Sequence, residues 1–559
     1  MNNLWREELY SPSSACEVAP YELLESEQLE AEIRDFQQAS QGILENPYDP
    51  ELWLNRAHCL RLLGYPELAL GDIYKARLLA EAALSSNSTT IGTLALEAYS
   101  KNVYNLHMTH PAYVRFKSCV STPELLKTWS IRMLGRVEVQ IWTELMEGLL
   151  AANCCDDYLR LSKEAVQKFP EDDIFPSEVA NAENWNEQRI AILQERVDDG
   201  EMTEEQMSTN LLSGGVYPVA YPWMTDDILT RDEDLLQKLK SEFLAVSTNC
   251  TVAKSTIRDV ADSDDGEALS EVDVLGVIST SAIDAGSTVL IDATTASAIS
   301  STSRCPTCCG AVAADTSFVN ECCEVRYCSE TCSSTALEKF HKSICKKDLS
   351  FLTSAAEKAT KTTDFSIDSL LLLRVLALSM QEAASTHPLQ SSLLSRLTPT
   401  YDMAEPQLII FNFATHIATP LQTLQALGVD VFARAEYDTW VLHTMRCRLQ
   451  NNKHGQTLDG AIGTAVNPLY SMFNHSCEPN VDWRHDARSS TVTMFAERDV
   501  APGHELLISY IRGRELLAPA GVLPRPQRAA MLMTWFGMDC RCARCEREKL
   551  AEAVEGLEI

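Results

Sequence analysis

The sequence predicts a multidomain protein of the α+β class, and three observations carry that prediction. Apolar residues recur at helical spacing through the first two hundred residues. Short β-branched runs separated by turns occupy residues 271–292 and return from residue 461. Twelve of the 19 cysteines gather in two clusters, at residues 305–345 and at residues 477 and 540–545. The chain of 559 residues, 45% of them hydrophobic, is long enough for about three or four domains.

Composition narrows the class of protein further. The net charge of −32 opposes non-specific binding to nucleic acid and favours basic partners such as lysine-rich tails. The first twenty residues lack a basic start followed by an apolar run, and no stretch reaches 18 uninterrupted apolar residues. We therefore expect a soluble protein of the nucleus, the cytoplasm or both, away from membranes. Because these compartments keep thiols reduced, the clustered cysteines indicate metal ligation instead of disulfides.

Residues 1–215 are predicted to form a helical domain. The stretch from residue 50 to residue 80 contains two amphipathic helices joined by a Gly64-Tyr65-Pro66 turn. These helices match the tetratricopeptide pattern, and a weaker second unit spans residues 145–170. An ordinary helical hairpin is the alternative. The predicted inward faces carry Trp53, Ala57 and Leu60 on the first helix and Ala69, Ile73 and Ala76 on the second.

A domain with short strands is predicted to follow, interrupted twice. Residues 216–300 form its first part, where 271–292 are expected to fold as a β-hairpin around an Ile-Asp-Ala-Gly turn. Residues 348–460 are predicted to be a helical insert, in which LLLLRVLALSM and DTWVLHTMRCRLQNN are the clearest amphipathic pieces. Strands and turns return over residues 461–518, and residues 519–559 form a tail.

Between these parts, residues 301–347 form a cysteine-rich segment with the spacing of metal ligands. Structural zinc needs four thiolate or imidazole ligands in a tetrahedron, and short spacings let one turn supply two of them. Cys309 is a possible substitute for Cys322 or Cys323 as a ligand. The candidate ligands are Cys305, Cys308, Cys322, Cys323, Cys328, Cys332, His341 and Cys345.

Three motifs near the C-terminus are informative through their order and spacing. Asn474-His475-Ser476-Cys477 is followed by Glu505-Leu-Leu-Ile-Ser-Tyr510, and then by Cys540-x-Cys542-x2-Cys545. Together they resemble the catalytic core of a SET-domain protein lysine methyltransferase. The run RYCSETC followed by FHKSIC resembles a MYND zinc finger.

The chain is thus similar to SET- and MYND-domain methyltransferases of the fungal type, which carry tetratricopeptide-like helices at the N-terminus. The resemblance covers roughly residues 217–548, with the MYND finger inserted in a split SET domain. It implies a post-SET zinc knuckle in the tail. Several relatives carry a further C-terminal helical domain, and we expect it to be missing here, with the N-terminal helices as a possible replacement.

The resemblance also implies an activity and a set of site residues. The activity is S-adenosylmethionine-dependent methylation of a protein lysine, with Tyr510 as the catalytic residue. Tyr470 and Phe473 are candidates for lining the lysine channel. One zinc ion is expected on Cys477, Cys540, Cys542 and Cys545, and one or two in the MYND finger. The residues expected to bind the cofactor are Gly276, Asn452, Asn474 and His475.

A rival hypothesis is an adaptor that binds protein partners through its tetratricopeptide and MYND surfaces and carries a SET fold with little activity. Two departures favour it: Gly276 stands alone where relatives show Gly-x-Gly, and Met538 stands where relatives place an aromatic residue. The presence of Asn474, His475 and Tyr510 together favours the enzyme. A zinc-dependent DNA-binding regulator is disfavoured, because the chain is acidic and lacks a basic recognition helix.

Overall fold

The computed structural model describes most of the chain in two compact units. The first unit comprises Met1–Trp223 and Leu408–His443, and the second comprises Met224–Gln407 and Thr444–Ile559. The division falls within helix α16 (Thr439–Asn452). The described residues are 5–16, 22–87, 89–109, 120–199, 202–255, 275–313, 318–359, 365–382, 387–398, 407–486, 490–515, 522–536 and 539–555.

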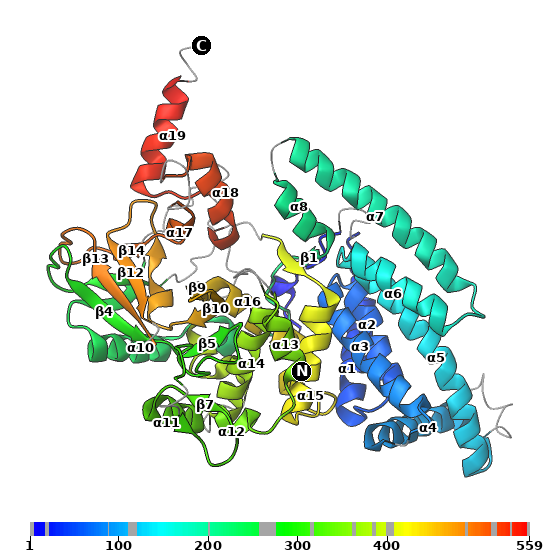
Figure 1. Ribbon diagram of the computed structural model, residues 1–559. Coiled ribbons are helices and arrows are strands. Elements are labelled where there is room, and N and C mark those ends of the chain that lie inside the picture. The colour runs from blue at the N-terminus through cyan, green and yellow to red at the C-terminus, as the bar shows by residue number, and fades with distance from the viewer. Residues whose placement is uncertain are drawn as a thin grey trace. The chain divides into compact units, whose positions relative to one another are not determined.

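The first unit is helical, as predicted. Helix α3 packs against α2, α4 and α5, and α6 packs against α7 (Figure 1). A short antiparallel sheet joins β1 (Gly214–Val216) to β8 (Ile409–Phe411). The helices are α1 (Ser26–Glu45), α2 (Pro50–Leu62), α3 (Pro66–Leu84), α4 (Thr90–Thr109), α5 (Pro123–Ala151), α6 (Cys155–Lys168), α7 (Ile174–Asp198), α8 (Glu204–Leu211), and α15 (Thr419–Leu427) after a π-helical turn at Ala414–Ala418.

Helices α2 and α3 form the hairpin expected from the sequence. Asp49 caps α2 by accepting a hydrogen bond from the Glu51 N–H, and Pro50 occupies the first turn, where no donor is lost. Gly64 turns the chain with φ +84°, a conformation that suits glycine. The predicted inward residues are all buried, which confirms both faces: Trp53, Ala57, Leu60, Ala69, Ile73 and Ala76.

A buried network of charges joins this hairpin to residues 408–443. The Arg56 guanidinium contacts Asp72 at 2.6 Å and Asp438 at 2.9 Å, and Lys75 Nζ lies 2.6 Å from Asp438. Burial alone would raise the pKa of Asp438, but Arg56 and Lys75 more than offset it and hold that pKa below its usual range. The Lys75 ammonium also lies 4.3 Å from the centre of the Trp53 ring.

This packing divides the segment that the sequence presents as one helical insert over 348–460. Residues 408–443 belong to the helical first unit, and only the parts on either side belong to the second. The amphipathic pattern identified the helices correctly, but it does not say which core they cover. In this arrangement the buried carboxylate of Asp438 has the cations that it requires, which α2 and α3 supply.

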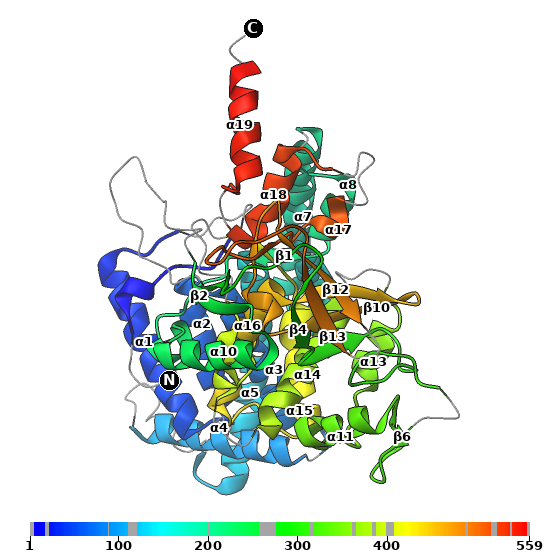
Figure 2. The same cartoon turned by 90° about the vertical axis from the view of Figure 1, so that its left-hand side faces the viewer.

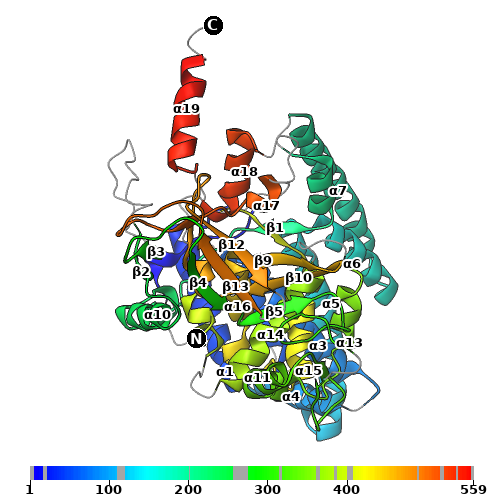
Figure 3. The ribbon, with the colours of Figure 1, turned by 60° about the vertical axis from the view of Figure 1, so that its left-hand side comes forward.

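The second unit contains the β-structure. One sheet has the order β12-β13-β4 and another the order β5-β10-β9. Figure 2 shows β4, β13 and β12 together, and Figure 3 shows β2 and β3 with α10 (Glu233–Val246) beside them. The strands are β2 (Cys250–Lys254), β3 (Leu275–Ser279), β4 (Thr288–Ala293), β5 (Ala296–Ile299), β6 (Phe318–Val319), β7 (Arg326–Tyr327), β9 (His454–Leu458), β10 (Ala461–Val466), β11 (Asn474–His475), β12 (Val481–Asp486), β13 (Thr491–Ala496) and β14 (Leu507–Ile508).

The predicted β-hairpin over 271–292 is wrong in its pairing, although both strands exist. Strand β3 pairs with β2, and β4 pairs with β13. The connection between them pairs with a distant segment, since the Ile283 and Val500 backbones exchange hydrogen bonds of 2.9 Å and the Gly286 N–H donates to Ala496. Local alternation predicts a strand but does not identify its neighbour. Residues 271–274 lie outside the described part of the chain.

Helices α13 (Ser350–Ala356) and α14 (Phe365–Gln381) pack on each other, and α14 also contacts β5 and β10. The main core of the unit joins β2, β3, β4, β12, β13 and α10 through buried apolar side chains such as Val277, Val492 and Met494. The described helices include none that is long and apolar enough to cross a membrane. The remaining helices of this unit are α9 (Asp226–Leu229), α11 (Glu330–Lys339), α12 (His341–Ile344), α17 (Arg512–Glu515), α18 (Arg525–Phe536) and α19 (Ala543–Glu555).

Two helical glycines of the first unit provide a test of its packing. A Cβ on Gly71 would lie 2.2 Å from Thr439 Oγ1, whereas a Cβ on Gly135 would meet nothing within 4 Å. We expect Gly71→Ala to lower the free energy of unfolding by about 1–3 kcal/mol through overpacking. Gly135→Ala should raise it by about 0.5–1 kcal/mol, because alanine favours helix. Urea unfolding followed by circular dichroism measures both, and a stabilised Gly71→Ala would contradict this packing.

Candidate active site and metal clusters

The candidate active site lies where two distant segments meet in parallel. Asn474 pairs with Leu507 and His475 with Ile508, and the Ser476 N–H donates to the Ile508 carbonyl at 2.9 Å. The Asn480 side chain joins the same segments, since its Nδ2 donates to the Glu505 carbonyl and its Oδ1 accepts from the Leu507 N–H. The Asn-His-Ser-Cys motif and the Tyr510 strand are therefore brought together as the sequence predicts.

Asn474 lies in a compact polar cluster with Gly276 and Glu505. Its Nδ2 donates to the Leu275 carbonyl at 3.0 Å and to Glu505 Oε1 at 2.8 Å. A Cβ on Gly276 would lie 2.2 Å from that same carboxylate oxygen, so the space beside Gly276 is filled by Glu505. Ser255 Oγ donates to the carboxylate as well, at 2.9 and 3.0 Å. Burial raises the pKa of Glu505.

His475 connects the backbone of Tyr510 to the cysteine cluster of the tail. Its Nδ1 accepts a hydrogen bond from the Tyr510 N–H at 3.0 Å, and its Nε2 lies 3.3 Å from Cys477 Sγ. Burial lowers the pKa of His475 to about 4, so the ring is neutral near pH 7. Because Nδ1 accepts, the ring proton is on Nε2 and points at the Cys477 sulfur.

The Tyr510 side chain is partly buried between aromatic neighbours. Its hydroxyl donates to the Phe473 carbonyl at 2.9 Å, and its ring centre lies 5.2 Å from His475 and 5.7 Å from Trp535. Phe473 itself is buried in the core, whereas Tyr470 packs edge-on against Trp483. Met538, where relatives place an aromatic residue, lies outside the described residues, and Trp535 provides an aromatic face nearby.

Asn452 is the one predicted cofactor residue that no contact joins to this cluster within the described residues. It ends α16, where its Nδ2 donates to the Thr398 and Arg448 carbonyls at 2.7 Å each. The amide is thus held firmly by backbone groups. Its role toward a cofactor stays a prediction.

Two cysteine clusters form within residues 305–345. In each, the candidate ligand atoms all lie within 4.8 Å of one another, which suits a single metal ion. Cys309 belongs to neither cluster among the described residues: it is buried, with φ +60° in the turn that carries Cys305 and Cys308. The adjacent Cys322 and Cys323 both lie in the second cluster. The clusters are Cys305, Cys308, Cys328 and Cys332, and Cys322, Cys323, His341 and Cys345.

Each of these clusters has neighbours suited to a metal site. The Tyr327 hydroxyl lies 3.0 Å from His341 Nδ1, which leaves Nε2 directed at Cys322 Sγ, 3.2 Å away. At the other cluster the Gly310 N–H donates to Cys308 Sγ at 3.3 Å. The Arg374 guanidinium lies over the Phe340 ring and donates to the Pro306 carbonyl. Burial lowers its pKa to about 10, which still leaves a cation to oppose the thiolates.

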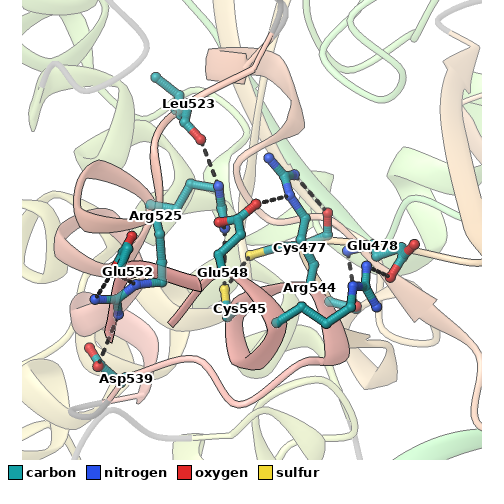
Figure 4. A network of polar contacts seen from close by, with 12 residues as sticks. Cys477, Glu478, Leu523, Arg525, Asp539, Arg544, Cys545, Glu548 and Glu552 are labelled. Carbon is teal, nitrogen blue, oxygen red and sulfur yellow. Dashed lines mark hydrogen bonds and ion pairs between the residues drawn. The ribbon is translucent and has the colours of Figure 1, made fainter. Parts of the chain in front are cut away.

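The third cluster joins the tail to the motif. Cys477, Cys540, Cys542 and Cys545 bring their sulfurs within 4.8 Å of one another. Figure 4 shows the surrounding polar network, in which Arg544 donates to the Cys477 carbonyl at 3.0 Å and Arg525 pairs with Glu552. The buried Arg528 donates to Cys545 Sγ at 3.4 Å and to Glu548. Four thiolates around one divalent ion carry a net charge of about −2, so a buried guanidinium suits the site.

Sequence reasoning missed several residues of this region. Ser255 gave no signal because it lies 250 positions from Glu505, and Arg528 gave none because nothing in the local sequence marks it as a neighbour of Cys545. Asn480 follows Cys477 by three residues, so its closeness to the motif was visible in the sequence. Glu505 was visible as the first residue of the Tyr510 motif, but its contact with Asn474 depends on strand pairing and could not be read from the sequence.

Comparison with known proteins agrees with this geometry. Residues 274–511 match the family model described as the SET domain. The chain is 35% identical over 82 residues to histone-lysine N-methyltransferase SET5 of Yarrowia lipolytica, a stretch covering 15% of this chain and 17% of that protein. It is 34% identical over 92 residues to mouse protein-lysine N-methyltransferase SMYD4, covering 16% and 10%.

A SET and MYND domain-containing protein of Dictyostelium discoideum is 34% identical over 107 residues, covering 19% of this chain and 24% of that protein. The chain therefore spans less than a quarter of the length of each of these relatives. The SET-domain match, the nature of the relatives and the three cysteine clusters among the described residues lead to one conclusion. The chain thus contains a region that matches the SET domain, and its relatives include histone-lysine and protein-lysine N-methyltransferases and a SET and MYND domain-containing protein.

Proposed function

We propose that this protein is an S-adenosylmethionine-dependent protein lysine N-methyltransferase. The observation that carries the proposal is the parallel pairing of β11 with β14, which gathers Asn474, His475 and Tyr510 at one place. The relatives named as histone-lysine and protein-lysine N-methyltransferases support the same activity. Its substrate would be a lysine of a histone or of another protein.

When bound, S-adenosylmethionine supplies an electrophilic methyl group on its sulfonium. Asn474 and His475, with Gly276 beside them and Asn452 as a further candidate, would hold that cofactor. The Tyr510 hydroxyl donates a hydrogen bond to the Phe473 carbonyl, so the lone pairs of its oxygen can accept a hydrogen bond from the lysine amine. Orienting a neutral amine in this way favours in-line attack, and a fixed phenol dipole stabilises the developing charge.

We further propose that the three clusters hold zinc: two ions in a MYND-type finger and one in a post-SET knuckle. Closed sets of four ligands are typical of structural zinc, and every cluster has four. The tail ion would stabilise the segment that carries Trp535 against Tyr510. The finger and the N-terminal helices, which we take as tetratricopeptide-like, would bind protein partners. Reduced cysteines that can hold zinc fit the nucleus or the cytoplasm.

The activity can be tested by calorimetry and by methyl transfer to purified core histones. Wild-type protein should bind S-adenosylmethionine, and Asn474→Ala should weaken binding about tenfold or more, because a ligand hydrogen bond is lost. Tyr510→Phe should bind the cofactor within about threefold of wild type but transfer methyl groups about a hundredfold more slowly.

Tyr104→Phe, which alters an exposed phenol of α4, is the control and should keep the transfer rate of wild type. Failure of the wild-type protein to bind the cofactor would contradict the proposal and favour the adaptor. Binding without transfer to histones would exclude these histones as substrates and direct the search to other lysines.

Metal content tests the zinc assignment. We expect three zinc ions per chain by mass spectrometry of purified protein, since each cluster offers four ligands. Cys477→Ser should lose one ion. Cys309→Ser is the matched control and should keep all three, because this thiol lies outside the clusters. Two ions in the wild-type protein would mean that the adjacent Cys322 and Cys323 do not share a site.

The buried Arg528 should make the tail ion harder to extract than it would be without this guanidinium. We expect Arg528→Met to make this ion about 10–100 times easier to extract with a chelator, because a charged contact to Cys545 is lost. Arg525→Met removes a partly exposed guanidinium that pairs with Glu552 and Asp539, and should change extraction by less than about threefold. Equal extraction from both variants would exclude a role for the Arg528 charge.

A further inference from the structure

The half-buried carboxylate of Glu505 lies beside Asn474, a residue proposed to bind the cofactor, and the proposed function gives this carboxylate no role. Its backbone is fixed on both sides, since the Ser279 N–H donates to the His504 carbonyl at 2.9 Å and the Leu506 N–H to the Val277 carbonyl at 2.7 Å. The Asn480 amide also donates to the Glu505 carbonyl. The side chain therefore starts from a rigid point and reaches Asn474 and Ser255.

The contacts of Asn474 determine which way its amide is turned. Both of its hydrogen-bond partners within the described residues, the Leu275 carbonyl and the Glu505 carboxylate, are acceptors. Only the NH2 end of the amide can donate to them, so that end faces the protein. The Oδ1 end then remains as an acceptor on a partly exposed side chain, and it can bind only a donor.

S-adenosylmethionine carries one strong donor of this kind, the ammonium of its amino-acid part. A hydrogen bond from an ammonium to a neutral amide oxygen is charge-assisted and is stronger than a bond between two neutral groups. The Glu505 carboxylate, which accepts a hydrogen bond from the other end of this amide, also attracts a cationic cofactor electrostatically. Gly276 permits the arrangement, because any Cβ there would displace the Glu505 oxygen, 2.2 Å away.

We propose that Glu505 is a positioning residue, held by Ser255, that turns the Asn474 amide so that its oxygen accepts the ammonium of the cofactor. The inference rests on the proposed function and assigns to Glu505 a share in cofactor selection beyond fixing the backbone. It requires no proton transfer by Glu505.

Two ligands separate this role from a purely structural one. S-adenosylmethionine contains the ammonium, and 5′-methylthioadenosine lacks the whole amino-acid part but keeps the adenosine. Glu505→Ala should weaken S-adenosylmethionine binding by about 10- to 100-fold, measured by calorimetry. Its binding of 5′-methylthioadenosine, measured by ligand-detected NMR, should stay within about threefold of wild type.

The conservative variant Glu505→Gln tests whether the hydrogen bond to Asn474, without the charge, is enough for binding. In Glu505→Gln, the side-chain oxygen can still accept from Asn474 while the new NH2 donates to Ser255 Oγ, so S-adenosylmethionine affinity should stay within about fivefold of wild type. Glu497→Gln, at a partly exposed pair with Arg512, is the matched control and should bind both ligands as wild type does.

Three results would overturn the inference while leaving the proposed function intact. They are unchanged S-adenosylmethionine affinity in Glu505→Ala, equal loss of both ligands in that variant, and a Glu505→Gln variant as weak as Glu505→Ala. Absence of S-adenosylmethionine binding by the wild-type protein is a different result. It would refute the proposed function and this inference with it.

Discussion

The candidate active site depends on one short parallel pairing, in which Asn474 and His475 of β11 pair with Leu507 and Ile508 of β14. Strands β11 and β14 are too short to be stable alone, and a parallel pair cannot be closed by a tight turn. The Asn480 side chain supplies what the short ladder lacks, because it bonds to the backbone at Glu505 and at Leu507. Everything assigned to the site, from Asn474 to Tyr510, follows from that register.

The metal clusters and the site share a second constraint, which is the accommodation of buried charge. Arg528 faces the tail thiolates, Arg374 lies near the first finger cluster, and Asp438 faces Arg56 and Lys75. At Arg528 and at Asp438, a charge that would be costly if unpaired is held by a partner of opposite sign. Such pairs select one packing over others, because a misplaced element would leave a charge unpaired.

Much of this could be predicted from the sequence, for identifiable reasons. Cysteine spacing gave the eight candidate ligands of residues 305–345 and three of the tail ligands, and the family resemblance gave the fourth, Cys477; the division of the eight into two sets of four came from the structure. Helical periodicity gave the buried face of α2 and α3. The pairing of β3 and β4 was missed because alternation is local, whereas the choice of neighbour depends on residues two hundred positions away. The adherence of residues 408–443 to the first unit was missed for the same reason.

The interleaved course of the chain has a consequence for its synthesis. Asp438 pairs with Lys75 and shares Arg56 with Asp72, yet Asp438 is separated from both cations by more than 350 positions. At roughly 5–20 residues per second, a ribosome needs about 10–40 s to pass from the end of the first long segment to residue 443. During that interval Arg56 can pair with Asp72, but the inward Lys75 lacks the carboxylate of Asp438. Molecular chaperones that shield incomplete helical surfaces would therefore have a defined window in which to act on this protein.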